Sequence, residues 1–205
     1  MPERSNILVL VSGNGSNLQA LIEAEAGGAL GNGRIAAVLS DREGAYALER
    51  AKAAGIPFFV EKPNRGLPKP ERRSELSDRI LQFCREKKIA LIVYAGYLSV
   101  LAGAIIKEYE GRMINLHPAL LPKFGGEGMY GERVHRAVLA AGSLESGCTV
   151  HLVDEGIDTG PVILQRKVPV LPDDTPDSLA ERIHKEEHIA IVEAVKIILE
   201  KMRLL

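Results

Sequence analysis

Short apolar runs recur along the first half of the chain. Residues 7–11, 35–39, 58–60 and 90–94 are almost wholly apolar, as in ILVLV at 7–11. Runs of this length without alternation between apolar and polar side chains indicate strands that are buried on both faces. We therefore expect four strands inside a layered protein.

Helical patterns separate these runs. Apolar residues recur at helical spacing over residues 17–25, 45–54 and 71–88, and in the last of these Leu76 and Ile80 share one face. Strands that alternate with helices are typical of a parallel sheet covered on both faces. The chain is therefore predicted to be an α/β protein with a doubly wound, mostly parallel, Rossmann-like sheet.

The pattern changes in the later part of the chain. Residues 147–153 and 162–170 are predicted as strands on either side of the turn-rich DEGIDTGP, which places antiparallel strands near the C-terminal part. A final helix is predicted from about residue 177 to the end. Since no internal repeat or low-complexity linker interrupts the sequence, residues 1–205 are expected to form one domain, with 62–73 as its most flexible segment.

The first strand leads directly into residues 12–17 (SGNGSN) and then into a helix. Glycines let the backbone approach a ligand closely, and the start of a helix offers free N–H groups and a positive dipole end. The loop therefore suits a phosphate, although it matches neither the dinucleotide fingerprint nor the P-loop. A tight turn with Ser16 or Asn17 as the helix cap is the structural alternative.

Asn115 and His117 stand at the end of an apolar run that begins at Met113. Alternate residues of a strand face the same side, so the amide and the imidazole are expected to point together. An amide can donate to a developing oxyanion, and an imidazole can carry a proton near neutral pH. The pair is suited to acyl transfer.

Asp158 is the candidate partner of His117, because it lies in the turn-rich GIDTGP between two predicted strands. A carboxylate beside an imidazole raises the imidazole pKa and fixes its orientation. Sequence spacing leaves open whether Asp158 meets His117 or only forms a β-turn.

The remaining histidines carry weaker signals. His135 falls in a predicted helix, and His151 falls in a predicted strand, where core or sheet-face packing accounts for it. Residues 184–188 (HKEEH) match the H-x-x-E-H metal pattern, but no third ligand is evident, so no metal is expected. The sequence contains no G-x-S-x-G elbow for a nucleophilic serine.

Composition limits the kinds of binding partner and the cellular location that we expect. A formal net charge of -1 indicates neither nucleic acid nor an anionic membrane as a partner. No apolar stretch approaches the roughly 20 residues of a membrane span, and the first apolar run is too short for a signal peptide. The two cysteines form neither a disulfide framework nor a zinc pattern, so a reducing cytoplasm is the expected location.

Several motifs occur in one order along nearly the whole chain: NILVLVSGNGSNLQALIEA, AGYLSVL, INLHPALLP, GCTVHLVDEGIDTGPVILQ and RIHKEEH. Together they resemble the folate-dependent formyltransferases, and SGNGSN resembles the glycinamide ribonucleotide branch of that family. The resemblance implies one formyltransferase domain, residues 1–205, acting in de novo purine biosynthesis. Its reaction would move the formyl group of 10-formyltetrahydrofolate to the amine of 5′-phosphoribosylglycinamide.

The resemblance also implies roles for particular residues. The catalytic trio would be Asn115, His117 and Asp158. The ribonucleotide would contact Gly15, Ser16, Asn17 and Glu187. The folate would be bordered by Arg73, Leu98, Ser99, Val100, Leu101, Asn115, Asp154 and Asp158. The folate is a cosubstrate that needs no metal, and a monomer or homodimer is expected to act on these two small molecules.

Two segments depart from the usual pattern of the family. The link after INLHPALLP is longer and rich in glycine, KFGGEGMYG at residues 123–131, and Ser99 stands where an Arg is frequent. These departures bear on folate affinity and loop motion, not on the reaction class. Loop 123–131 is expected to be a mobile cover near the ribonucleotide.

Two alternative functions stay open. A formyltetrahydrofolate hydrolase shares the Asn, His and Asp, but that family adds an N-terminal regulatory domain, whereas the first strand here is expected from residue 6. A nucleotide-binding module without catalysis has no need of all three residues.

In the expected transfer, Asn115 and protonated His117 stabilise the oxyanion that forms at the formyl carbon. His117 also moves the proton, through a water held by Asp158.

Overall fold

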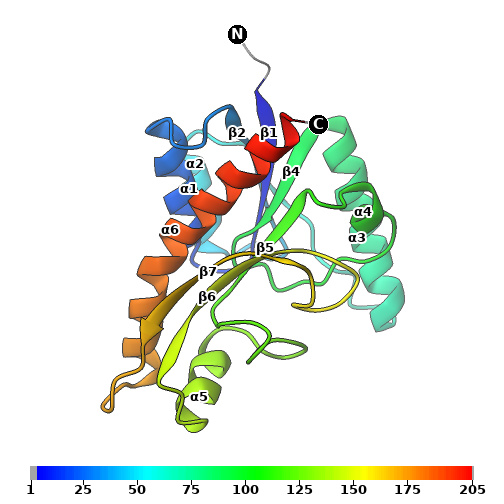
Figure 1. Cartoon of the computed structure of the whole chain (residues 1–205). Coiled ribbons are helices and arrows are strands. Elements are labelled where there is room, and N and C mark those ends of the chain that lie inside the picture. Colours follow the sequence, from blue (N-terminus) through cyan, green and yellow to red (C-terminus); the bar gives the residue numbers. More distant parts are fainter. Residues whose placement is uncertain (1–3, 205) are drawn as a thin grey trace.

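A seven-stranded mixed sheet forms the centre of the computed structural model, which describes residues 4–204 (Figure 1). Its strand order is β3-β2-β1-β4-β5-β6-β7. The strands are β1 (Ser5–Val11), β2 (Gly33–Ser40), β3 (Phe58–Val60), β4 (Ile89–Tyr94), β5 (Met113–His117), β6 (Glu145–Leu152) and β7 (Val162–Pro169). Pairing is parallel from β3 to β5 and antiparallel from β5 to β7, so the predicted fold class is confirmed.

Helices cover both faces of this sheet. They are α1 (Ser16–Ala26), α2 (Tyr46–Ala53), α3 (Lys69–Glu86), α4 (Ala104–Glu108), α5 (Glu132–Ala140) and α6 (Pro176–Met202). The sequence analysis missed α4, because its five residues are too few for a helical period to show. The prediction that residues 62–73 are the most flexible segment was partly wrong, since residues 69–73 form the start of α3.

The unbroken apolar run in β1 follows from burial on both faces. Ile7 and Val9 pack in the cluster that contains α1 and α6, whereas Leu8 and Leu10 pack in the cluster that contains α3 and α4. Figure 1 shows α1 and α6 on one side of the sheet and α3 and α4 on the other. Full burial of each such side chain stabilises the fold by about 1.5–3 kcal/mol.

The topology determines where a ligand can bind. Strand order reverses between β1 and β4, and a crevice forms beyond the carboxyl ends of parallel strands at such a point. Loop 12–17 follows β1, the segment 95–101 follows β4, and His117 ends β5. These segments therefore meet at one edge of the sheet. No helix within residues 4–204 has the length and apolar character to cross a membrane.

Candidate active site

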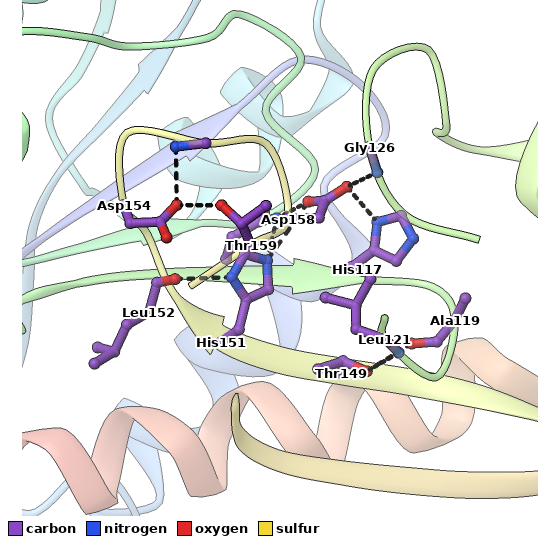
Figure 2. A network of polar contacts seen from close by, with 12 residues as sticks. His117, Ala119, Leu121, Gly126, Thr149, His151, Leu152, Asp154, Asp158 and Thr159 are labelled. Carbon is purple, nitrogen blue, oxygen red and sulfur yellow. Dashed lines mark hydrogen bonds and ion pairs between the residues drawn. The ribbon is translucent and has the colours of Figure 1, made fainter. Parts of the chain in front are cut away.

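Asn115, His117 and Asp158 lie together at the end of β5, and His151 joins them. Asp158 Oδ2 is 3.4 Å from His117 Nδ1, and Asp158 Oδ1 accepts from Asn115 Nδ2 at 3.3 Å. His151 Nε2 lies 3.5 Å from Asp158 Oδ1 (Figure 2). The contact between Asp158 and His117, which sequence spacing left open, is present in the structure.

Asp158 holds this group of side chains together. Its backbone adopts φ 59°, a left-handed conformation that is uncommon outside glycine but is tolerated by Asp and Asn. The Gly126 N–H donates to Oδ2 at 3.0 Å. Burial acts to raise the pKa of Asp158, but its contacts with His151, His117 and Gly126 hold that pKa below the usual value. The carboxylate is therefore charged at neutral pH.

His117 is held between two acceptors. Its Nε2 donates to the carbonyl of Phe124 at 2.8 Å, while Nδ1 faces Asp158. Burial lowers the pKa of His117 below 6.5, although the Asp158 charge and the Phe124 carbonyl act in the opposite direction. The expected effect of the carboxylate, which raises this pKa, is present, but desolvation of the imidazole is the larger cause and the net pKa is lowered.

His151 is buried on the sheet, as core or sheet-face packing requires, but it also contacts two of the predicted catalytic side chains, Asn115 and Asp158, which the sequence analysis did not foresee. It pairs with Asn115 across the antiparallel β5 and β6, and its Nε2 lies 3.1 Å from Asn115 Nδ2. Its Nδ1 donates to Leu152 O at 2.8 Å, which orients the ring (Figure 2). The missing signal was the strand register, since cross-strand partners share a face but cannot be read from one sequence.

One cavity of about 760 Å³ joins the parts of the site. Every residue proposed from the sequence as a site residue lines it: Gly15, Ser16, Asn17, Arg73, Leu98, Ser99, Val100, Leu101, Asn115, His117, Asp154, Asp158 and Glu187. Part of loop 123–131, from Gly126 to Gly131, lines the same cavity. The volume is within the usual range for small-molecule sites.

Loop 12–17 is shaped by Gly15. This residue, at φ 77°, precedes α1 as its cap, and no side chain caps the helix, so the alternative with Ser16 or Asn17 as cap was wrong. The side chain of Asn17 instead donates to Glu187 Oε2 at 3.2 Å. Burial raises the pKa of Glu187. The start of α1 thus opens into the cavity, with Glu187 of α6 beside it.

Gly15→Ala is expected to lower the free energy of unfolding by about 2 kcal/mol or more. An added Cβ would lie 2.5 Å from Ala47 Cβ and 2.8 Å from Ala47 Cα, at a φ that alanine rarely adopts. Gly13→Ala is the matched control, because a Cβ there meets nothing within 4 Å. Urea denaturation of both variants measures the difference, and equal stability would contradict this account of the loop.

The segment 98–101 is held by serine hydroxyls. Ser12 Oγ accepts from the N–H of Leu98 at 2.8 Å, and Ser77 Oγ accepts from that of Ala102 at 2.9 Å. Ser99, which stands where the family often has an Arg, donates from Oγ to the buried Asp41 at 2.7 Å. The backbone from Leu98 to Leu101 is therefore fixed beside the cavity without an Arg side chain.

His135 gives the fold a specific pH dependence. Burial, followed by the charges of His184 and His117, lowers the pKa of His135 from 6.5 to about 4. The unfolded chain therefore binds a proton that the folded chain excludes between these values. Stability is complete above pH 6.5 and decreases by about 3 kcal/mol as the pH falls to 4.

Urea denaturation between pH 7 and pH 4 measures this loss. The variant His135→Gln, which does not titrate, is expected to lose less stability than the parent chain over the same range. A parallel loss in both proteins would show that other groups account for the pH dependence.

The HKEEH segment lies on α6, where Glu187 and His184 line the cavity. His184 Nε2 is 3.8 Å from Glu187 Oε2. In the part of the chain that the structure describes, no group of three or more His, Cys, Asp or Glu is placed to hold a metal ion. These side chains therefore belong to the end of the cavity beside the start of α1.

A doubly wound sheet with an Asn, a His and an Asp at its ligand-binding edge is the arrangement that the motif resemblance led us to expect. The formyl transferase family model matches residues 5–195, so the chain belongs to that family.

Within this family, the chain is similar to proteins named phosphoribosylglycinamide formyltransferase or glycinamide ribonucleotide transformylase. The phosphoribosylglycinamide formyltransferase of Escherichia coli is 39% identical over 183 residues, which cover 89% of this chain and 82% of that protein. A glycinamide ribonucleotide transformylase from Symbiobacterium toebii superposes with a TM-score of 0.88 at 37% identity, covering 98% of this chain and 90% of the other.

A third relative is much longer than this chain. The trifunctional purine biosynthetic protein adenosine-3 of Drosophila melanogaster is 43% identical over 193 residues, which make up 94% of this chain. The match spans only 14% of the insect protein.

Proposed function

We propose that this chain transfers the formyl group of 10-formyltetrahydrofolate to the amine of 5′-phosphoribosylglycinamide, a step of purine biosynthesis. The observation that supports this function is the single cavity in which the phosphate loop, the three polar side chains and the segment 98–101 meet. A phosphate held at the start of α1 would direct the amine of the ribonucleotide toward Asn115 and His117. The folate would enter along 98–101 and the loop that carries Asp158.

In the proposed reaction the amine attacks the formyl carbon, and a tetrahedral oxyanion forms. Asn115 Nδ2 and His117 Nε2 supply the hydrogen-bond donors, each worth about 3 kcal/mol in the transition state. In the structure these donors face Asp158, His151 and Phe124 O. Substrate binding therefore exchanges internal acceptors for the formyl oxygen, and loop 123–131 must withdraw the Phe124 carbonyl.

Proton transfer completes the proposed reaction. Because burial lowers its pKa, His117 is neutral at pH 7, with its one proton on Nε2, so Nδ1 is the nitrogen that can take the proton that the amine loses. The resulting imidazolium is stabilised by the charge of Asp158 at 3.4 Å. His117 then gives the proton to the folate nitrogen as the C–N bond to the formyl group breaks. Tetrahydrofolate and the formylated amide leave, and no covalent enzyme intermediate forms.

We extend the proposal to the whole chain. Residues 1–205 act as one domain, as a monomer or homodimer in the cytoplasm, on two small molecules. Neither a metal, a nucleic acid nor a membrane takes part.

An absorbance assay of tetrahydrofolate release tests this function. Release from 10-formyltetrahydrofolate is expected only when 5′-phosphoribosylglycinamide is present, with the formylated ribonucleotide as the second product. Release that does not depend on the amine would indicate a hydrolase. Binding of both ligands without release would indicate a non-catalytic module.

A further inference from the structure

Helix α2 supports loop 12–17 from the side opposite the cavity. Every residue of this loop lines the cavity, whereas no residue of α2 does. The N–H of Ala47, in the first turn of α2, donates to Gly13 O at 3.1 Å. Arg50, one turn further along α2, donates from Nε to Asn14 O at 2.9 Å. Two successive carbonyls of the loop therefore point toward α2 and away from the cavity.

Arg50 binds Asn14 at two points. Besides the bond from Nε, its Nη2 donates to Asn14 Oδ1 at 2.9 Å. Its Nη1 donates to Gln19 Oε1 of α1 at 3.3 Å, and its Cζ lies 5.0 Å from the centre of the Tyr46 ring. Within residues 4–204, no carboxylate lies at ion-pair distance from Arg50. The planar guanidinium thus fixes the loop through neutral acceptors, and its positive charge has no carboxylate counterion.

The direction of these two carbonyls determines the direction of two N–H groups. The peptide bonds that join Gly13 to Asn14 and Asn14 to Gly15 are trans. In a trans peptide the N–H points opposite to the C=O. The N–H groups of Asn14 and Gly15 therefore point away from α2, toward the cavity. Successive N–H groups in such a turn, here beside Gly15 at φ 77°, form a concave site for an anion.

We propose that Arg50 is a positioning residue for the phosphate of 5′-phosphoribosylglycinamide. It holds the Asn14 carbonyl toward α2, so that the Gly15 N–H donates to the phosphate. The inference rests on the proposed function, because it takes this phosphate as the anion at loop 12–17. Arg50 itself does not line the cavity, so it acts through the loop and not by contact. Without Arg50, the peptide between Asn14 and Gly15 is free to turn its carbonyl oxygen toward the phosphate, which that oxygen repels.

Amide NMR with inorganic phosphate tests this role without any turnover. In the parent chain, phosphate is expected to shift the amide signals of Asn14 and Gly15. Arg50→Gln removes the charge and the paired contact with Asn14, so the Kd for phosphate should rise about tenfold. Lys52→Gln is the matched control, because it removes an exposed cation of the same helix outside the cavity, and it should keep the parent Kd.

Calorimetry separates positioning from a general loss of structure. The ribonucleotide, titrated without folate, is compared with glycinamide riboside, which lacks the phosphate. Arg50→Gln is expected to weaken binding of the ribonucleotide about tenfold and to change binding of the riboside by less than twofold. Equal losses for both molecules, or no loss for either, would overturn the inference.

Arg50→Lys separates orientation from charge. Lysine keeps the positive charge, but it has no planar fork that can bind Asn14 O and Oδ1 together. Its Kd for the ribonucleotide should therefore lie between those of the parent and Arg50→Gln. Affinity equal to that of the parent would mean that the charge alone is sufficient, and the proposed orientation of the loop would be wrong.

These outcomes are separable from the proposed function. A chain that binds inorganic phosphate in an Arg50-dependent way but transfers no formyl group would retain the positioning role and lose the proposed reaction. A chain that transfers the formyl group, with a Kd for the ribonucleotide that Arg50→Gln does not change, would retain the reaction and lose the role of Arg50.

Discussion

Asp158→Asn is expected to lower kcat by about 10³-fold while leaving the affinity for both substrates within a few-fold. The carboxylate lies 3.4 Å from His117 Nδ1, and in the proposed mechanism its charge stabilises the imidazolium. Asparagine keeps the size, tolerates φ 59° and can still accept from the Gly126 N–H. The loss therefore reports the charge and not a collapse of the site. Steady-state kinetics with both substrates measure the effect.

A control variant and a stability measurement show whether the loss of kcat is specific to the Asp158 charge. Asp78→Asn, an exposed carboxylate on α3, is the matched control and should leave kcat unchanged. The free energy of unfolding of Asp158→Asn should remain within about 1 kcal/mol of the parent chain. A kcat within threefold of the parent, in a folded variant, would remove Asp158 from the proposed mechanism.

The sheet could be predicted from sequence because its strands are buried on both faces. Burial makes the runs at β1 and β4 uninterrupted, and the helices between them show a clear period. The strand order β3-β2-β1-β4-β5 was not predicted, because doubly wound sheets occur with more than one order. The short α4 leaves too little periodicity to detect, so it was missed.

Only the site residues that lie in recognisable sequence motifs could be predicted. Asn115, His117 and Asp158 follow from strand alternation and from the family resemblance, and the structure brings them together. His151 was missed because its place depends on the register between β5 and β6. The Phe124 carbonyl and the Gly126 N–H were missed for a related reason. Their contacts depend on how a glycine-rich loop folds back, which no periodic pattern encodes.

The loop 123–131 connects these missed features. A Cβ on Gly125 would lie 2.5 Å from Leu121 Cδ2 and 3.2 Å from Asp158 Cβ, so glycine permits the close approach. The segment before it is anchored on β6, where Thr149 Oγ1 accepts from the Leu121 N–H and donates to Ala119 O. A fixed start and a close approach to Asp158 explain how this loop reaches the catalytic pair His117 and Asp158.

His117→Ala is expected to reduce kcat by about 10²–10⁴-fold, because it removes both an oxyanion donor and the proton carrier. His117→Gln separates these roles, since its amide can donate to the oxyanion but cannot carry a proton. Its kcat should lie between those of the alanine variant and the parent. His151→Ala, which removes the contacts to Asn115 and Asp158, should lose less activity than His117→Ala.

The pH profile distinguishes a neutral from a protonated His117. Since burial lowers its pKa below 6.5, the imidazole is neutral at pH 7 and becomes protonated only as the pH falls further. In the parent chain kcat should therefore be constant around neutral pH and decrease on the acid side, below the usual histidine range. His117→Gln should lack this acid limb. A rate that instead rises toward low pH would mean that the imidazolium starts the reaction, and that the charge of Asp158 outweighs burial once substrates are bound.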